Sequence, residues 1–281
     1  MGSAGLSCTI ETFTAGDGYR WRYRRYPDGE SYKAHVVCLH GVQSHGGWYE
    51  YSCNQLCDAG YQVHFLDRRG SGMNEMDRGD APSFRRLLDD VAEYLGPLRE
   101  SKRMVFLVAI SWGGKLGVAL QRRHPGQVDG LALLCPGFFP KVRHSLGQRC
   151  AIAAARLINP QKRFPIPLND PELFTDNPKW LQFLRDDPLS LKEATARLLL
   201  ESARLDGYLR FVTRYVRVPI LLMLAEKDRI IDNFRTRRYV ESLPATDKET
   251  IEYAGARHTL EFEADPERFV KDLVQWLDQR A

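Results

Sequence analysis

An apolar run that stops at a serine, with small residues directly after it, constrains this chain more than any other feature. Residues 104–110 are typical of a buried strand, and a helix-like segment begins directly after Ser111. A serine at a tight strand-to-helix turn is typical of a nucleophile elbow, where bulky neighbours would collide. Small residues stand on both sides, Ala109 two positions before the serine and Gly113 and Gly114 after it. Alanine replaces the more usual glycine in this A-x-S-x-G pattern, and we interpret the extra methyl group as tolerated.

Ser111 also has a simpler interpretation, as the N-cap of the helix that follows. A serine in that position commonly accepts a hydrogen bond from one of the first free backbone N–H groups. In the elbow interpretation, the extra methyl of Ala109 crowds the turn, and we expect strained backbone dihedrals at Ser111.

Strand-like and helix-like segments alternate along most of the chain. Short apolar runs predict strands at 34–41, 61–67, 104–110, 128–135, 218–225 and 248–254. Helical patterns lie near 47–59, 83–99, 111–124, 233–242 and 266–279. This alternation predicts an α/β fold with a mostly parallel, doubly wound sheet. Residues 6–14 and 19–26 alternate apolar and polar residues across the turn 15–18, which predicts an antiparallel hairpin at the sheet edge.

The alternation breaks between residues 137 and 216, where no strand-like run is found. Helical patterns lie near 141–158, 178–186, 189–205 and 207–215. The segment 189–205 combines a wide apolar arc with one charged stripe, made of Glu193, Arg197, Glu201 and Arg204. We therefore predict a core domain of residues 1–136 and 217–281 with a helical cap, or lid, of residues 137–216. The alternative is an ordinary helical subdomain with no role in the site.

A nucleophilic serine needs a base within hydrogen-bond reach. His258 is the first candidate, because it follows the last predicted strand in a polar loop. His45, in the glycine-containing loop 41–47, is the second candidate. Asp228 directly follows the strand 218–225 and is the candidate carboxylate that orients the imidazole.

Two other carboxylates near Asp228 are weaker candidates for that role. Glu226 is too close to the end of its strand to reach across to a histidine. Asp232 precedes Asn233 at the start of the next predicted helix, and we interpret it as an N-cap.

Acyl transfer also needs preset donors for the negative oxygen that develops in the reaction. The backbone N–H of Trp112 is available by position, because this residue directly follows the serine. We expect the second donor in the loop after strand 34–39, with the N–H of Val42 as the candidate. His40, in the same loop, is interpreted as a residue that stabilises the loop by hydrogen bonding.

Composition excludes several classes of function. The 281 residues carry a net charge of +4 with both signs mixed, and no basic block predicts nucleic-acid binding. No apolar run is long enough to span a bilayer, and the first residues lack a signal-peptide pattern, so we expect a cytoplasmic protein. The six cysteines, interpreted as reduced and mostly buried thiols, form no metal-ligand pattern, so neither a metal nor another cofactor is expected.

Five blocks of this sequence resemble the α/β-hydrolase superfamily, and within it the monoacylglycerol lipase and lysophospholipase branch. They lie in the expected order at 39–50, 67–72, 109–117, 224–232 and 257–263. The order serine, aspartate, histidine is also that of the α/β-hydrolases. The sequence departs from the branch at Ala109, usually glycine, and at Asn74, often serine.

This resemblance implies a serine ester hydrolase with Ser111, His258 and Asp228 as its triad and an acyl-enzyme intermediate. It implies single-chain acyl esters, such as monoacylglycerols, as small-molecule substrates. Apolar residues of the cap are candidates for transient contact with a lipid surface. The alternatives are thioester or carbon–carbon bond hydrolysis on the same triad, and a binding or receptor protein with little turnover.

Overall fold

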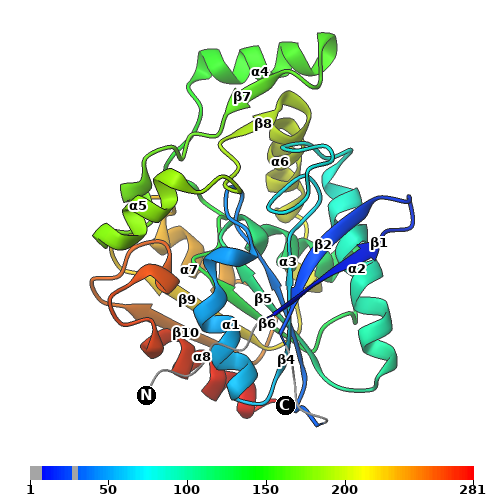
Figure 1. Cartoon of the computed structure of the whole chain (residues 1–281), viewed down its shortest axis with the longest axis vertical. Coiled ribbons are helices and arrows are strands. Elements are labelled where there is room, and N and C mark those ends of the chain that lie inside the picture. Colours follow the sequence, from blue (N-terminus) through cyan, green and yellow to red (C-terminus); the bar gives the residue numbers. More distant parts are fainter. Residues whose placement is uncertain (1–7, 27–30) are drawn as a thin grey trace.

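A computed structural model describes residues 8–26 and 31–281, and within these residues an eight-stranded sheet forms the centre of the molecule (Figure 1). Its strands are β1 (Thr9–Thr14), β2 (Arg20–Arg25), β3 (His35–Leu39), β4 (Gln62–Leu66), β5 (Val105–Ile110), β6 (Gly130–Leu134), β9 (Ile220–Ala225) and β10 (Lys248–Tyr253). They lie in the order β1-β2-β4-β3-β5-β6-β9-β10. The β1–β2 and β2–β4 pairs are antiparallel and all other neighbours are parallel, which confirms the predicted fold class. Residues 6 and 7 of the predicted hairpin lie outside the described residues.

Helices cover both faces of this sheet (Figure 1). They are α1 (Glu50–Asp58), α2 (Phe84–Glu100), α3 (Trp112–Arg123), α7 (Asn233–Glu241) and α8 (Glu267–Asp278). In β3, Cys38 lines a small cavity together with Leu273 of α8, whereas the next residue, Leu39, lines another together with Leu116 of α3. Successive side chains of a strand point to opposite faces, so α8 and α3 lie on opposite sides. Every residue of β3, β4, β5, β6 and β9 is buried, which explains their continuous apolar runs.

Residues 137–216 leave the sheet after β6 and return to it at β9, the direct neighbour of β6. Their helices are α4 (Leu146–Ile158), α5 (Pro178–Asp186) and α6 (Ala196–Leu209). Figure 1 shows α4 at the end of the molecule opposite the C-terminus, beyond the carboxyl ends of the parallel strands. The division into a core and a cap with separate roles stays a prediction.

Three expectations for this segment are wrong. It contains a short antiparallel pair, β7 (Arg163–Pro165) with β8 (Glu193–Thr195), and three-residue strands are too short to show an alternating pattern. The predicted helix 189–205 begins only at Ala196, because the side chain of Thr195 accepts a hydrogen bond from Leu198 N and caps the helix there. The helix predicted at 207–215 is the end of α6 followed by a separate 3-10 turn, η3 (Thr213–Tyr215).

Within the charged stripe, the ion pair on α6 joins Glu201 to Arg204, three residues away. Arg197 bonds instead to Asp80 of the core, and the buried Glu201 accepts from Phe84 N at the start of α2. The charged stripe therefore ties α6 to the sheet domain. Among the described residues, no helix has both the length and the apolar character needed to cross a membrane.

Candidate active site

The turn from β5 to α3 has the geometry of a nucleophile elbow. Ser111 has φ 51° and ψ −117°, a strained conformation for a residue other than glycine. The strain expected at this residue is therefore confirmed. The side chain of Ser111 makes no cap hydrogen bond to α3, so the interpretation as a simple N-cap is wrong.

The glycines that follow Ser111 are required by close contacts with neighbouring residues. A Cβ atom on Gly113 would lie 2.6 Å from the carbonyl oxygen of Leu39, at the end of β3. A Cβ atom on Gly114 would lie 2.6 Å from Cβ of Pro136. Ala109 is fully buried in β5. A larger residue at either glycine would push α3 away from the strand ends.

The structure brings Ser111, His258 and Asp228 together in one hydrogen-bonded row. His258 Nε2 lies 2.9 Å from Ser111 Oγ, and His258 Nδ1 lies 2.7 Å from Asp228 Oδ2. The carboxylate of Asp228 also accepts from the backbone N–H groups of Ile230 and Ile231, at 2.7 and 3.0 Å. A carboxylate facing Nδ1 places the proton of the neutral imidazole there, so Nε2 faces the serine hydroxyl as an acceptor.

Sheet topology explains this convergence. Ser111 follows β5, Asp228 follows β9 and His258 follows β10, and these parallel strands end at the same edge of the sheet. The weaker carboxylate candidates are used elsewhere: Glu226 accepts from Gly255 N, and Asp232 caps α7 by accepting from Arg235 N.

Cys135, which follows β6 at the same edge, was expected only to be a buried thiol within a strand. Its sulfur lies within 4.8 Å of the ligand-type atoms of Asp228 and His258. Because Cys135 directly follows β6, the neighbour of β5, its place in the sequence could have predicted that it lies near Ser111. Burial raises the pKa of the Cys135 thiol well above its usual range, which keeps it protonated. The Asp228 and His258 atoms of this cluster bond to each other at 2.7 Å, so the cluster belongs to the Ser111–His258–Asp228 row.

The loop Gly41–Gly47, which we call the oxyanion loop, follows β3 and passes directly beside the serine. A Cβ atom on Gly41 would lie 3.3 Å from Cβ of Ser111. Arg68 donates to the carbonyl oxygens of Gly41 and Val42 at 2.8 and 2.7 Å. His40 accepts from Arg68 N through Nε2 and bonds the Gly41 carbonyl through Nδ1, so it stabilises this loop, as expected.

Within residues 8–26 and 31–281, no protein acceptor bonds the backbone N–H of Val42 or of Trp112. The fold itself therefore uses neither of these two N–H groups within the described residues. His45, the second candidate base, has both ring nitrogens engaged elsewhere: Nδ1 accepts from Gly47 N, and Nε2 faces Asp187.

A model of the family described as serine aminopeptidase, S33, matches residues 30–265. Phospholipase YtpA of Bacillus subtilis is 23% identical over 247 residues, which are 87% of this chain and 95% of that protein. Human monoglyceride lipase is 24% identical over 259 residues, covering 88% and 83% of the two chains. Among solved structures, this chain is similar to a soluble variant of monoglyceride lipase from Saccharomyces cerevisiae in complex with a substrate analog. The TM-score is 0.86 and the identity is 20%, and the match covers 99% of this chain and 97% of the other. Because the family model spans most of its length, this chain belongs to the serine aminopeptidase S33 family, within the α/β-hydrolase superfamily.

Proposed function

We propose that this protein is a serine hydrolase that cleaves single-chain lipid esters through Ser111, His258 and Asp228. The observation that carries the proposal is the contact of 2.9 Å between Ser111 Oγ and His258 Nε2, at a serine with a strained backbone. A nucleophile and a base within hydrogen-bond reach, with the base oriented by a third group, define this type of catalysis.

In the proposed first half-reaction, His258 Nε2 removes the proton of Ser111 as Oγ attacks the ester carbonyl carbon. The N–H groups of Val42 and Trp112 then stabilise the oxyanion, and Asp228 stabilises the charged imidazole. The proton on His258 passes to the leaving alcohol, which leaves an acyl group on Ser111.

In the second half-reaction, His258 activates a water molecule, which attacks the acyl carbon and forms a second tetrahedral intermediate at the same donors. Its collapse breaks the bond to Ser111 Oγ, which regains a proton from His258. The products are a carboxylic acid and the free enzyme.

The substrate class is supported by the relatives, which include a phospholipase and a monoglyceride lipase. It is also supported by apolar side chains of the insert that lie close to the triad. The ring of Phe174 lies 6.1 Å from the imidazole of His258, centre to centre, and Thr259 N donates to the Phe174 carbonyl. Trp112 Nε1 bonds Ser202 Oγ of α6 at 2.8 Å. We therefore propose that residues 137–216 act as a cap over Ser111.

We also propose that α4 contacts the lipid surface from which the substrate is drawn. Its large apolar side chains Leu146, Leu157 and Ile158 are 76%, 86% and 86% exposed. Residues 137–169 contain no Asp or Glu, and their basic residues are Lys141, Arg143, Arg149, Arg156, Lys162 and Arg163. An apolar helix face within a basic segment fits an anionic membrane surface.

A panel of substrates tests the proposed reaction. Monoacylglycerols and p-nitrophenyl esters of increasing chain length would be compared with an acyl-CoA, a 1,5-diketone and an aminoacyl p-nitroanilide. We expect the highest kcat/KM on monoacylglycerols, together with loss of turnover and of fluorophosphonate labelling in Ser111→Ala. Faster turnover of the thioester, the diketone or the anilide would replace the ester assignment, and tight lipid binding without turnover would indicate a binding protein.

A further inference from the structure

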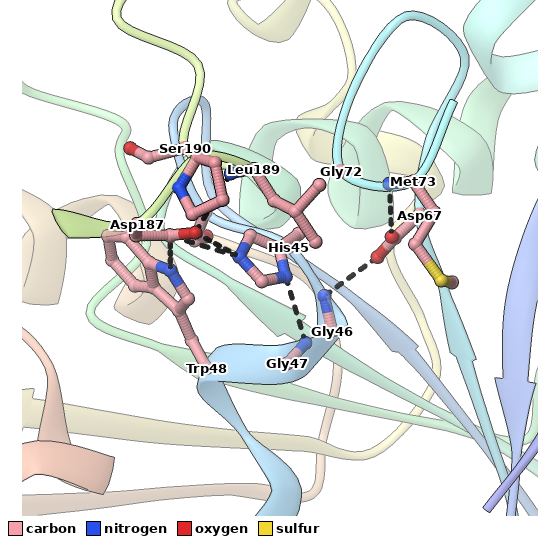
Figure 2. Close-up of polar contacts among 12 residues, drawn as sticks. His45, Gly46, Gly47, Trp48, Asp67, Gly72, Met73, Asp187, Leu189 and Ser190 are labelled. Carbon is pink, nitrogen blue, oxygen red and sulfur yellow. Dashed lines mark hydrogen bonds and ion pairs between the residues drawn. The ribbon is translucent and has the colours of Figure 1, made fainter. Parts of the chain in front are cut away.

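One segment of the insert bonds directly to the oxyanion loop. Residues 187–191, which we call the cap linker, connect α5 to β8 and lie beside residues 43–48 (Figure 2). Leu191 N donates to the carbonyl oxygen of Gln43 at 2.9 Å. His45 Nε2 lies 3.0 Å from Asp187 Oδ2, and both side chains are buried. The loop that carries Val42 is therefore attached to the insert by a backbone bond and a side-chain bond.

The carboxylate of Asp187 joins three parts of this region. Oδ2 accepts from Trp48 Nε1 at 2.7 Å, in the turn directly after the oxyanion loop. Oδ1 accepts from Leu189 N at 2.9 Å, which shapes the cap linker itself. Burial raises the pKa of Asp187, but the hydrogen bonds from His45 and Trp48 outweigh it and hold this pKa below its usual value. The group is thus the ionised acceptor at the centre of the contact.

The proton arrangement on His45 follows from its partners. Gly47 N donates to Nδ1 at 3.1 Å, so Nδ1 is the unprotonated acceptor of a neutral ring. Nε2 then carries the proton and donates it to Asp187. In the bond between loop and linker, His45 is therefore the donor and Asp187 the acceptor. An uncharged amide in place of the carboxylate of Asp187 is a weaker acceptor and weakens this bond.

Core residues hold the other sides of the same two segments. Asp67 accepts from Gly46 N at 2.7 Å and from Met73 N at 2.9 Å (Figure 2). Arg78 donates to the carbonyl oxygens of Leu189 and Pro188 in the cap linker, at 2.8 and 3.3 Å. Asp67 thus holds the oxyanion loop and Arg78 holds the cap linker, each on the side away from their mutual contact.

We propose that Asp187 is a positioning residue, which acts through His45 and Trp48 to hold the oxyanion loop so that Val42 N–H faces the reacting carbonyl at Ser111. The inference rests on the proposed function. A loop with glycine at 41, 46 and 47 has little stiffness of its own, so its position depends on the bonds that it makes, with Arg68 on one side and with the cap linker on the other. Displacement of a catalytic donor by about 1 Å can cost on the order of 100-fold in rate. The insert therefore contributes to the chemical step as well as covering the serine.

Asp187→Asn tests this role, with Asp206→Asn as the matched control. Asp206 also joins the insert to the core, through Lys115 at 2.5 Å, but its partner lies on α3 and not on the oxyanion loop. We expect Asp187→Asn to lower kcat on a monoacylglycerol and the rate of fluorophosphonate labelling roughly 10- to 100-fold. Binding of a non-cleavable ether analogue would be compared between Ser111→Ala and the double variant that also carries Asp187→Asn. We expect the two affinities to differ by less than about threefold. Asp206→Asn should retain wild-type kcat.

Substitutions at His45 keep the test decisive if Asp187→Asn does not fold. Glutamine at this position can still donate to Asp187, whereas alanine cannot, so His45→Gln should recover most of the kcat that His45→Ala loses. Equal kcat in Asp187→Asn and wild type would overturn the inference, as would equal losses in Asp187→Asn and Asp206→Asn. Absence of ester hydrolysis in the wild type would instead refute the proposed function, so the two failures are distinguishable.

Discussion

Ser52 donates its backbone N–H to the carboxylate of Glu261 at 3.0 Å, and this bond joins the first turn of α1 to the turn after His258. Both residues are buried. They line an enclosed cavity of about 20 Å³ that His258 also borders, enough for one water molecule. Burial raises the pKa of Glu261 to about 7 from its ordinary value of 4.5. A titratable group therefore lies three positions after the proposed base.

Glu261→Gln should reduce the dependence of stability on pH. The folded protein holds the proton of Glu261 more tightly than the unfolded chain does, so this contribution is full below pH 4.5 and is lost as the pH rises to about 7. The shift corresponds to about 3 kcal/mol. In urea unfolding, the free energy of unfolding of the variant should rise relative to that of wild type by about this amount as the pH is raised from 4.5 to 8. Parallel stability curves for the two proteins would contradict this expectation.

Asp228→Asn should lower kcat by roughly 10⁴-fold while the protein stays folded, because the imidazole loses the partner that sets its tautomer. Kinetics on a p-nitrophenyl ester and the melting temperature would measure the two effects. Asp232→Asn, four residues away at the N-cap of α7, is the control and should keep wild-type kcat. Comparable kcat values for the two variants would remove Asp228 from the proposed triad.

Gly113→Ala should destabilise the protein by about 1–3 kcal/mol, because the new methyl group meets the backbone oxygens of Leu39 and His40 at 2.6 and 2.8 Å. Activity should fall with it, since the elbow and the Trp112 N–H move together. Gly207→Ala is the control within α6, where nothing lies within 4 Å of the added atom. There alanine should stabilise the helix by about 0.5–1 kcal/mol. Chemical denaturation would measure the free energy of unfolding of both variants. A Gly113→Ala protein as stable as wild type would contradict the expected close contact at the elbow.

The double substitution of Leu157 and Ile158 by aspartate should weaken binding to vesicles that contain anionic lipid. Burial of one large apolar side chain is worth about 1.5–3 kcal/mol, so binding should fall at least roughly tenfold. Turnover of a soluble short-chain ester should stay unchanged. Phe234→Asp on α7, whose side chain is 69% exposed, is the control outside the insert and should bind like wild type. Vesicle sedimentation at low and high salt measures the effect, and equal binding of all three proteins would exclude α4 as the contact.

The main elements of the sheet domain were predictable, because buried parallel strands give continuous apolar runs and the following helices give amphipathic ones. Ser111, Asp228 and His258 each stand directly after such a run. Parallel strands end at one edge, so position in sequence was enough to bring these three side chains together.

The insert was less predictable because its contacts are distant in sequence. The start of α6 depends on Thr195, whose hydroxyl also donates to Asp80, 115 residues earlier. His45 and Asp187 are 142 residues apart, and no local periodicity records their pairing. Glu261 gave no sign of its burial, since its neighbours in the sequence are equally compatible with an exposed turn.

The direct pairing of β6 with β9 has a consequence for how such proteins diversify. Leu134 ends β6, and Ile220 begins the adjacent parallel strand β9 as the partner of Leu131, so the whole of the intervening segment connects two strands that are already neighbours in the sheet. A longer, shorter or unrelated segment can be accepted there without adding a strand or shifting any register. Exchange of this segment would change the surroundings of Ser111 and leave the strands that carry Ser111, Asp228 and His258 in place, and under our proposal the incoming segment would have to restore an acceptor for His45.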